Sequence, residues 1–258
     1  MKKISILTLL LSFFYFFILK ADDILIQPGE ELFYEVSYIG VKLGSIKVIT
    51  ESNQKLNGKS VHKCKAFIDS YRGIPFVSLH AIFESWLDPL VAFSHKFAGN
   101  TKVDDGWDYH QIIFDYPNNK ITLDRFKNKK KYATDNYTIK EKFNDGLSLF
   151  FFARKFIQSK RNVKVPTFID KDIVSTNIYF LGNKESTEID AVDYKVKTIY
   201  FQGKANWKGI YGLSGDFEGW FSDDLAAVPI KAKMKVYIGS VNIELISWKR
   251  KGWSPPKA

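Results

Sequence analysis

Cysteine is nearly absent from this chain, since Cys64 is the single cysteine among 258 residues. A lone cysteine excludes an internal disulfide and a metal site built from paired thiolates. In an exported protein such a residue could pair with another chain or react. The internal repeat described below favours a third reading, a buried and inert thiol.

Sequence motifs that carry catalysis are also missing. The chain contains no GxSxG nucleophile elbow and no Gly-rich phosphate loop that ends in Lys-Ser or Lys-Thr. Its four histidines do not have the HExxH or HxH spacing of metal ligands on one element. No nucleic-acid-binding motif is present. We therefore expect a protein that is not an enzyme, needs no metal or cofactor and binds no nucleic acid.

The richest polar cluster runs over residues 104–110, DDGWDYH. Its three carboxylates beside an imidazole could serve acid–base chemistry or hold a hard cation. The pair Asp105-Gly106 is also a strong signal for a hairpin turn. A calcium loop requires more ligands in a set order, so the turn is the favoured interpretation.

The first residues resemble an export signal. Two lysines precede an apolar run over residues 4–19, and Ala21 ends the segment. This is the pattern of a secretory signal peptide, residues 1–21. The rival interpretation is an uncleaved anchor, but the apolar run is shorter than the roughly 20 residues that span a bilayer. We expect an exported protein of the periplasm or outer cell envelope, with a single β-rich domain over residues 22–258.

Alternation of apolar and polar residues dominates the rest of the chain. The 22 Phe, 13 Tyr and 6 Trp residues suit strands, because bulky flat side chains pack well on a pleated surface. Residues 30–52 form a predicted hairpin that turns between Gly40 and Gly44. Further strands are predicted at 61–70, 79–87, 91–101, 107–116, 119–126, 172–183, 192–203, 215–222, 227–238 and 240–249. The expected fold is mainly β, an antiparallel curved sheet or barrel-like structure.

One segment breaks the strand period. Residues 145–160 place most of their apolar side chains on one face of a helix, and Asn144 or Asp145 can cap its first turn. Leu147 and Phe151 fall on the opposite side, among polar residues. This second apolar strip is covered either by a loop or by a partner or membrane.

A short motif is repeated in the two halves of the chain. Residues 83–89 are FESWLDP and residues 217–224 are FEGWFSDD, so each has Phe-Glu-x-Trp, an apolar residue and an acidic turn. We infer two similar strand meanders, about 28–140 and 165–250, joined by the central helix. A shared sheet would bury apolar faces and strand edges that neither half could bury alone.

The match extends to the strands on either side of the motif. In this alignment Cys64 corresponds to Val196, between two outward lysines, and Val91 corresponds to Val228. A cysteine at an apolar position acts as a small hydrophobic residue. The alignment therefore predicts that the Cys64 thiol is buried and inert.

Three ordered segments resemble one bacterial family. They are Gly29-Glu30-x-Leu32-x-Tyr34-x-Val36-x-Tyr38-x-Gly40-x-x-x-Gly44, then Asp145-x-Leu147-Ser148 with Arg154, and Trp220-x-Ser222-Asp223-Asp224 with Pro229. Together they are similar to the opening, the mid-chain helix and the late strand of the family called domain of unknown function 3108, over about residues 28–248. The resemblance implies an exported, mostly β envelope protein and no catalytic residues. The run Phe150-Phe151-Phe152 departs from it by adding apolar surface.

Two groups of residues are candidates for ligand contact. Aromatic-rich loops at matched places in the two halves supply the candidate mouth of a binding site: Tyr71, Ile74, Phe76, Trp207, Ile210 and Tyr211. A basic run could contact an anionic lipid headgroup: Arg125, Lys127, Lys129, Lys130 and Lys131. The alternative for the basic run is a solvated loop.

These features favour a non-enzymatic envelope protein that binds or carries an apolar or amphiphilic ligand, such as a lipid, inside the curved sheet. The alternative is a structural or assembly factor that contacts other envelope proteins through Leu147, Phe151 and the sheet edges. A packed interior would favour the second function, and a hollow one the first.

Overall fold

The computed structural model describes residues 25–74, 78–209, 214–236 and 239–258. The proposed signal peptide, residues 1–21, lies outside these residues and stays a prediction.

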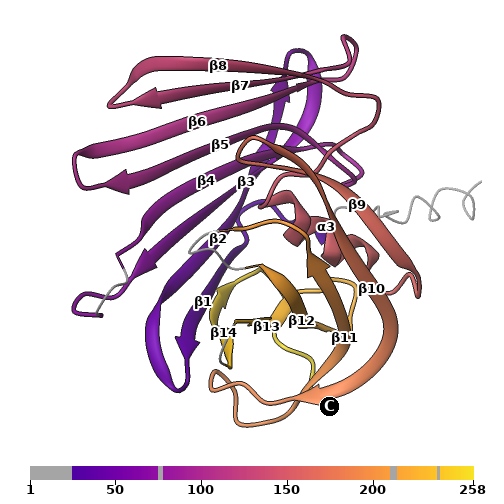
Figure 1. Cartoon of the computed structure of the whole chain (residues 1–258). Helices are drawn as coiled ribbons and strands as arrows, with labels where there is room; N and C mark the ends of the chain where they lie inside the picture. Colours follow the sequence, from indigo (N-terminus) through magenta and orange to yellow (C-terminus); the bar gives the residue numbers. More distant parts are fainter. Residues whose placement is uncertain (1–24, 75–77, 210–213, 237–238) are drawn as a thin grey trace, which may run out of the picture.

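Fourteen strands of the described chain form one antiparallel, curved sheet in the order β8-β7-β6-β5-β4-β3-β2-β1-β14-β13-β12-β11-β10-β9 (Figure 1). The first half contains β1 (Glu31–Tyr38), β2 (Val41–Leu56), β3 (Lys59–Ser70), β4 (His80–Leu87), β5 (Ser94–Val103), β6 (Gly106–Asp115), β7 (Lys120–Lys127) and β8 (Lys130–Thr138). The second half contains β9 (Asn162–Ile169), β10 (Asp172–Thr187), β11 (Val196–Ala205), β12 (Gly215–Ser222), β13 (Pro229–Lys235) and β14 (Ser240–Lys249). The predicted fold class is confirmed.

Pairing of β1 with β14 joins the two halves, so the sheet continues from one to the other. The sheet stays open, with β8 and β9 as its edges. The segment that follows β8 covers the β9 edge, because the Asn144 N–H donates to the Pro166 carbonyl and the Asn144 carbonyl accepts from the Phe168 N–H. Such cover protects an edge strand from pairing with another chain.

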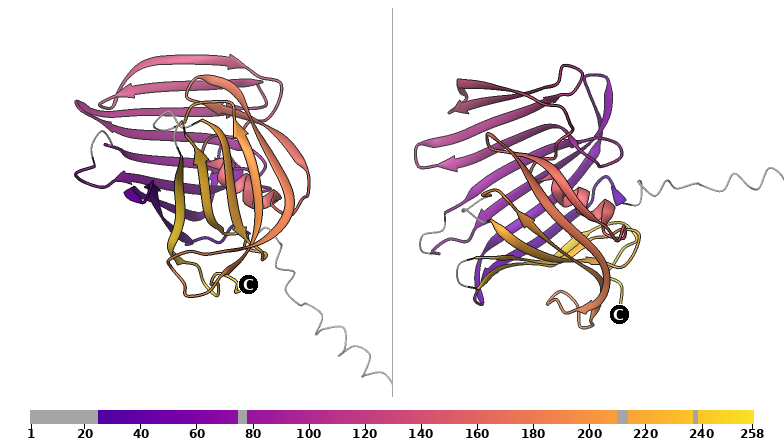
Figure 2. Two further views of the ribbon diagram at one scale, coloured as in Figure 1. Left: turned by 60° about the horizontal axis from the view of Figure 1, so that its bottom comes forward. Right: turned by 45° about the vertical axis from the view of Figure 1, so that its right-hand side comes forward.

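The helix α3 (Ser148–Phe156) lies on the concave side of the sheet, between its two halves (Figures 1 and 2). It is shorter than the predicted 145–160, because the chain turns where the Ser159 N–H donates to the Phe156 carbonyl. The Asp145 carboxylate accepts the N–H groups of Leu147 and Ser148 at 2.8 Å each, and so satisfies donors of the first turn as predicted.

The interior around α3 is packed. Phe151 is fully buried and Leu147 is 7% exposed, within one core that also includes residues from both halves of the sheet. The idea that these two side chains contact a partner or membrane is therefore wrong, because the sheet itself wraps around the short helix and covers both of its sides.

Corresponding strands of the two halves share irregular features. Strands β2 and β10 each have 16 residues and a register shift. The motif strands β4 and β12 each have 8 residues, and each shifts register against the next strand just after the motif tryptophan, between Trp86 and Leu87 and between Trp220 and Phe221. Among the described residues of the second half, the hairpin of β7 and β8 has no counterpart.

The acidic turns after the two motif strands also match. Asp88 accepts three backbone N–H groups of its own turn, and Asp224 accepts two. Each turn contains one non-glycine residue with positive φ, Val91 at 57° and Ala227 at 44°. Val91 thus corresponds to Ala227, one residue before the position that the sequence alignment gave.

The strand register also corrects the partner of Cys64. Cys64 pairs with Ser85, the residue before the first motif tryptophan. The equivalent Gly219 pairs with Phe201, so Cys64 corresponds to Phe201 and not to Val196. The thiol is nevertheless buried, as predicted, and burial raises its pKa well above the ordinary value.

Candidate ligand-binding site

The strand directions bring the predicted ligand-binding loops to one rim of the sheet. Successive antiparallel strands reverse direction, so the β1–β2, β3–β4, β5–β6 and β7–β8 turns share one rim. Tyr38, the last residue of β1, pairs with Val241 near the start of β14, so the β13–β14 turn lies at the same rim. Because β12 and β13 are antiparallel, the β11–β12 loop lies at this rim as well. We call it the turn rim. The described parts of both mouth loops and the basic β7–β8 turn lie along it.

The mouth residues are only partly within the described chain. Tyr71 is 38% exposed, Ile74 is half-buried, and the Trp207 indole N–H donates to the Thr176 hydroxyl at 2.8 Å. Phe76, Ile210 and Tyr211 lie outside the described residues. The site that these six residues were predicted to form stays a prediction.

Most of the predicted cationic contacts have carboxylate partners within the protein. Arg125 pairs with Asp135 at 2.5 Å, Lys127 with Asp105 at 2.7 Å, and Lys131 with Asp124 at 2.5 Å. The bond from Lys131 holds the pKa of Asp124 below its usual value.

Two lysines of the basic run remain for an external anion. Lys129 and Lys130, both exposed, have no carboxylate partner among the residues that the structure describes. They lie at the β7–β8 turn, so the cationic character of the run is concentrated at the turn rim.

The polar cluster at residues 104–110 forms a hairpin turn, as the Asp105-Gly106 pair predicts. Strand β5 ends at Val103, β6 begins at Gly106, and Gly106 has a φ of +136° that favours glycine. Asp105 and Asp108 both face the Lys127 ammonium, at 2.7 and 3.8 Å. These carboxylates therefore serve an ion pair that ties the turn to β7.

Half-buried apolar side chains line the inner face between α3 and the turn rim. They alternate with outward polar residues and come from strands of both halves: Val36, Ile46, Ile68, Phe217, Met234 and Ile243. We call them the inner strip. The packed core lies beyond them, around α3, so the interior is closed near the helix and apolar toward the turn rim.

A buried ion cluster fixes the opposite end. Glu30, 1% exposed, accepts two bonds from Arg154, at 2.6 and 3.1 Å, and another from Arg250. The Arg154 Nη2 group also donates to the carbonyls of Leu25 and Ala226, at 3.1 and 3.0 Å. Burial alone would raise the pKa of Glu30, but the two guanidinium groups outweigh it and hold that pKa below its ordinary value. The cluster ties α3 to the residues just before β1 and just after β14, the strands that join the two halves of the sheet.

Asp145 forms a second buried polar network beside it. Its carboxylate accepts the hydroxyls of Ser85 and Ser94 at 2.6 Å each, in addition to two helix N–H groups. Burial raises the pKa of this carboxyl, and the four donors oppose that rise. The network joins the motif strand β4 and the next strand β5 to the start of α3, which indicates a structural role.

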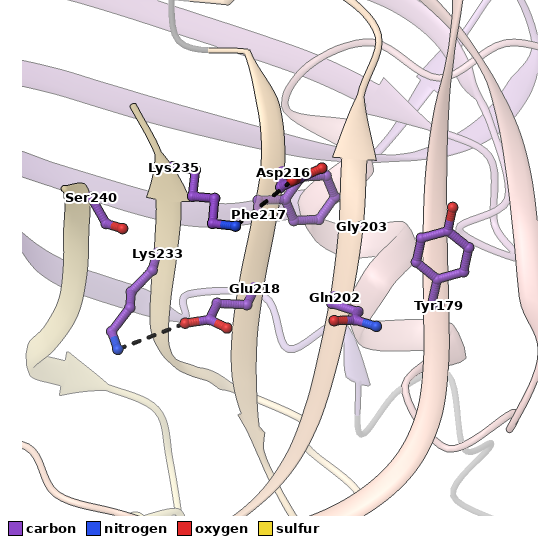
Figure 3. Close-up of a pocket in the computed structure, with 9 residues that line it drawn as sticks. All are labelled: Tyr179, Gln202, Gly203, Asp216, Phe217, Glu218, Lys233, Lys235 and Ser240. Carbon is purple, nitrogen blue, oxygen red and sulfur yellow. Dashed lines mark ion pairs between the residues drawn. The ribbon is translucent and has the colours of Figure 1, made fainter. Parts of the chain in front are cut away.

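Two cavities on the outer face of the sheet were not predicted from the sequence. One, of about 330 Å³, crosses β10 to β14, and its charged side chains face each other (Figure 3). There Lys233 lies 3.7 Å from Glu218, and Lys235 lies 4.0 Å from Asp216. The other, of about 590 Å³, has the lining residues Asn100, Trp107, Tyr109, Phe126, Asn128 and Lys129.

In the part of the chain that the structure describes, no helix combines the length and apolar character that a membrane crossing requires.

Comparisons with known proteins agree with this architecture. No curated protein matches the chain. It is similar to a solved structure, described as a beta-barrel-like protein of domain of unknown function DUF1849 from Brucella abortus. That match has 10% sequence identity and a TM-score of 0.55, and it covers 85% of this chain and 96% of the other. At this identity the likeness shows the fold alone.

The resemblance seen in the sequence extends over most of the chain. The family model described as "Protein of unknown function (DUF3108)" matches residues 34–246, which include nearly the whole sheet and α3. The chain therefore belongs to the DUF3108 family.

Proposed function

We propose that this chain is a non-enzymatic protein of the periplasm or cell envelope that binds an apolar or amphiphilic ligand such as a lipid. The observation that carries the proposal is the inner strip, a set of apolar side chains on the concave face that α3 leaves half-buried. Such a surface suits an acyl chain, because transfer of each CH₂ group from water contributes about 0.8 kcal/mol.

The charge at the turn rim supports an amphiphile with an anionic head. Lys129 and Lys130 lie at the rim toward which the inner strip opens, and each cation near an anionic group contributes about 1 kcal/mol. The tail contacts therefore supply most of the expected affinity, and the lysines favour anionic heads over neutral ones.

The packed interior around α3 favours the alternative, a structural or assembly factor, but that alternative lacks the contact surface predicted for it. Its proposed contact strip on the helix is buried, because Phe151 is fully enclosed and Leu147 nearly so. Only the edges of the sheet remain as contact surfaces for a structural or assembly factor, and the segment around Asn144 covers one of these edges.

Lipid that co-purifies with the protein tests the proposal. We expect organic extracts of the purified chain to contain a lipid at near-stoichiometric amounts by mass spectrometry. Ile243→Asp, which adds a charge to the inner strip, should lose that lipid. The matched control is Asn242→Asp, the preceding residue on the outer face, and it should retain the lipid. Extracts of the unaltered protein that contain no lipid would contradict the proposal.

A further inference from the structure

The larger outer cavity is built from aromatic side chains that point away from the core. Tyr109 on β6 pairs directly with Phe126 on β7, and their rings lie 5.3 Å apart. Trp107, two residues before Tyr109, shares the outer face and contacts the His80 ring at 5.4 Å. The core lies on the other side of these strands. Grouped outward aromatic residues around a cavity of about 590 Å³ therefore indicate a binding surface.

Asn100, one of the residues that line this cavity, has a polar atom without a partner. The Asn100 side-chain oxygen is buried, yet it accepts no hydrogen bond within the described residues. A buried acceptor without a donor is unfavourable, and it is rare in folded proteins. A ligand hydroxyl would supply the missing donor if the Asn100 side chain turned its buried oxygen toward the cavity.

The cavity is held in shape by the neighbouring turns. The Asn128 side chain accepts the Trp107 N–H at 3.0 Å and donates to the Asp105 carbonyl at 2.9 Å. A Cβ at Gly106 would lie 1.8 Å from the Asn128 side chain, so only glycine allows this contact without a shift. These bonds join the β5–β6 and β7–β8 turns and so fix the aromatic rings before any ligand arrives.

We propose that this outer cavity binds a saccharide that carries an acidic substituent. The aromatic faces of Trp107 and Tyr109 would pack against the C–H face of a sugar ring, and Asn100 would accept one of its hydroxyls. The Lys129 ammonium, which lines the cavity, would pair with a carboxylate or phosphate on the sugar. An acyl chain would leave the Asn100 oxygen unpaired, which is why a hydroxylated ligand fits better. The proposal is independent of the lipid site, because the inner strip lies on the opposite face.

Calorimetric titration of the whole chain with a hyaluronan tetrasaccharide, which carries glucuronate carboxylates, tests the proposal. We expect saturable binding, at least tenfold weaker in Trp107→Ala. The matched control is Trp86→Ala, an outward tryptophan of β4 that lies between Lys63 and Lys96 and does not line the cavity; it should bind normally. Lys129→Ala should weaken binding of this tetrasaccharide but not of neutral chitotetraose.

Asn100→Leu separates binding from folding. It removes the unpaired oxygen at nearly constant volume, so the melting temperature should stay the same or rise while affinity falls at least fivefold. Absence of saturable binding to either tetrasaccharide would overturn the proposal. So would unchanged affinity in Trp107→Ala. Displacement of the hyaluronan tetrasaccharide by dodecanoate at this site would show an acyl-chain cavity instead and would also overturn it. Each of these results leaves the mass-spectrometric test of the inner strip unaffected.

Discussion

Glu30→Gln is expected to lower the free energy of unfolding by about 3–5 kcal/mol, because it removes the carboxylate that bonds both guanidinium groups of a buried cluster. Arg154 has a fully buried side chain, and that of Arg250 is 4% exposed. Neither guanidinium group can reach solvent unless the contact between α3 and the sheet opens. Urea unfolding, followed by tryptophan fluorescence, measures the change.

Glu31→Gln is the matched control, one residue along the chain. Glu31 pairs with Lys47 at 2.7 Å on the solvent-exposed side, and its side chain is 25% exposed. Exposed pairs contribute about 0–1 kcal/mol, so this variant should unfold nearly like the unaltered protein. Equal losses in the two variants would contradict the role assigned to the buried cluster.

The same cluster predicts a dependence on pH. The pKa of Glu30 is lowered in the folded protein, so its contribution is complete above the unfolded pKa of about 4.3. That contribution is lost as pH falls from there through the lower folded pKa. The stability difference between the unaltered protein and Glu30→Gln should therefore be constant near neutral pH and shrink below about pH 4.

Phe151→Ala is expected to cost about 3–5 kcal/mol, because it removes a buried ring and leaves a cavity that the sheet cannot close. Phe151 packs against Phe150 with ring centroids 5.1 Å apart, inside the concave side of the sheet. Tyr132→Ala, at an aromatic side chain that is 61% exposed, should change stability by less than about 0.5 kcal/mol. Thermal unfolding of the three proteins checks both values.

This result also separates the two functions considered for the chain. If the Phe151 strip contacted a partner, its truncation would leave the isolated protein as stable as before. A loss of several kcal/mol shows that the strip belongs to the core, whereas an unchanged unfolding curve would restore the assembly-factor hypothesis.

The fold was predictable where the sequence pattern is local. Alternation identified most of the strands but missed β8 and β9, the two edge strands. The repeated Phe-Glu-x-Trp motif identified strands that do occupy equivalent places in the sheet, β4 and β12. Register was less predictable, because a bulge after each motif tryptophan inserts residues that alternation cannot reveal. The sequence alignment gave Cys64 the wrong counterpart because the hairpins before the two motifs differ in length: Cys64 lies 21 positions before its partner Ser85, and Phe201 lies 18 before Gly219.

The candidate sites depend on contacts between distant residues, which a single sequence does not show. Glu30 and Arg250 are separated by 220 positions and meet only because β1 pairs with β14. The basic run seemed uniform in sequence, yet Lys131 and its neighbours find carboxylates across the strands and only the turn lysines stay unpaired with acids among the described residues. Outward placement of Trp107 was readable from alternation, but the cavity beside it was not.

Titration of the purified, delipidated chain with a fluorescent fatty acid is the most direct test that the inner strip binds a ligand. We predict saturable uptake that Ile243→Asp abolishes and Asn242→Asp preserves. Uptake that fails to saturate, or that both variants retain equally, would contradict a binding site on the concave face.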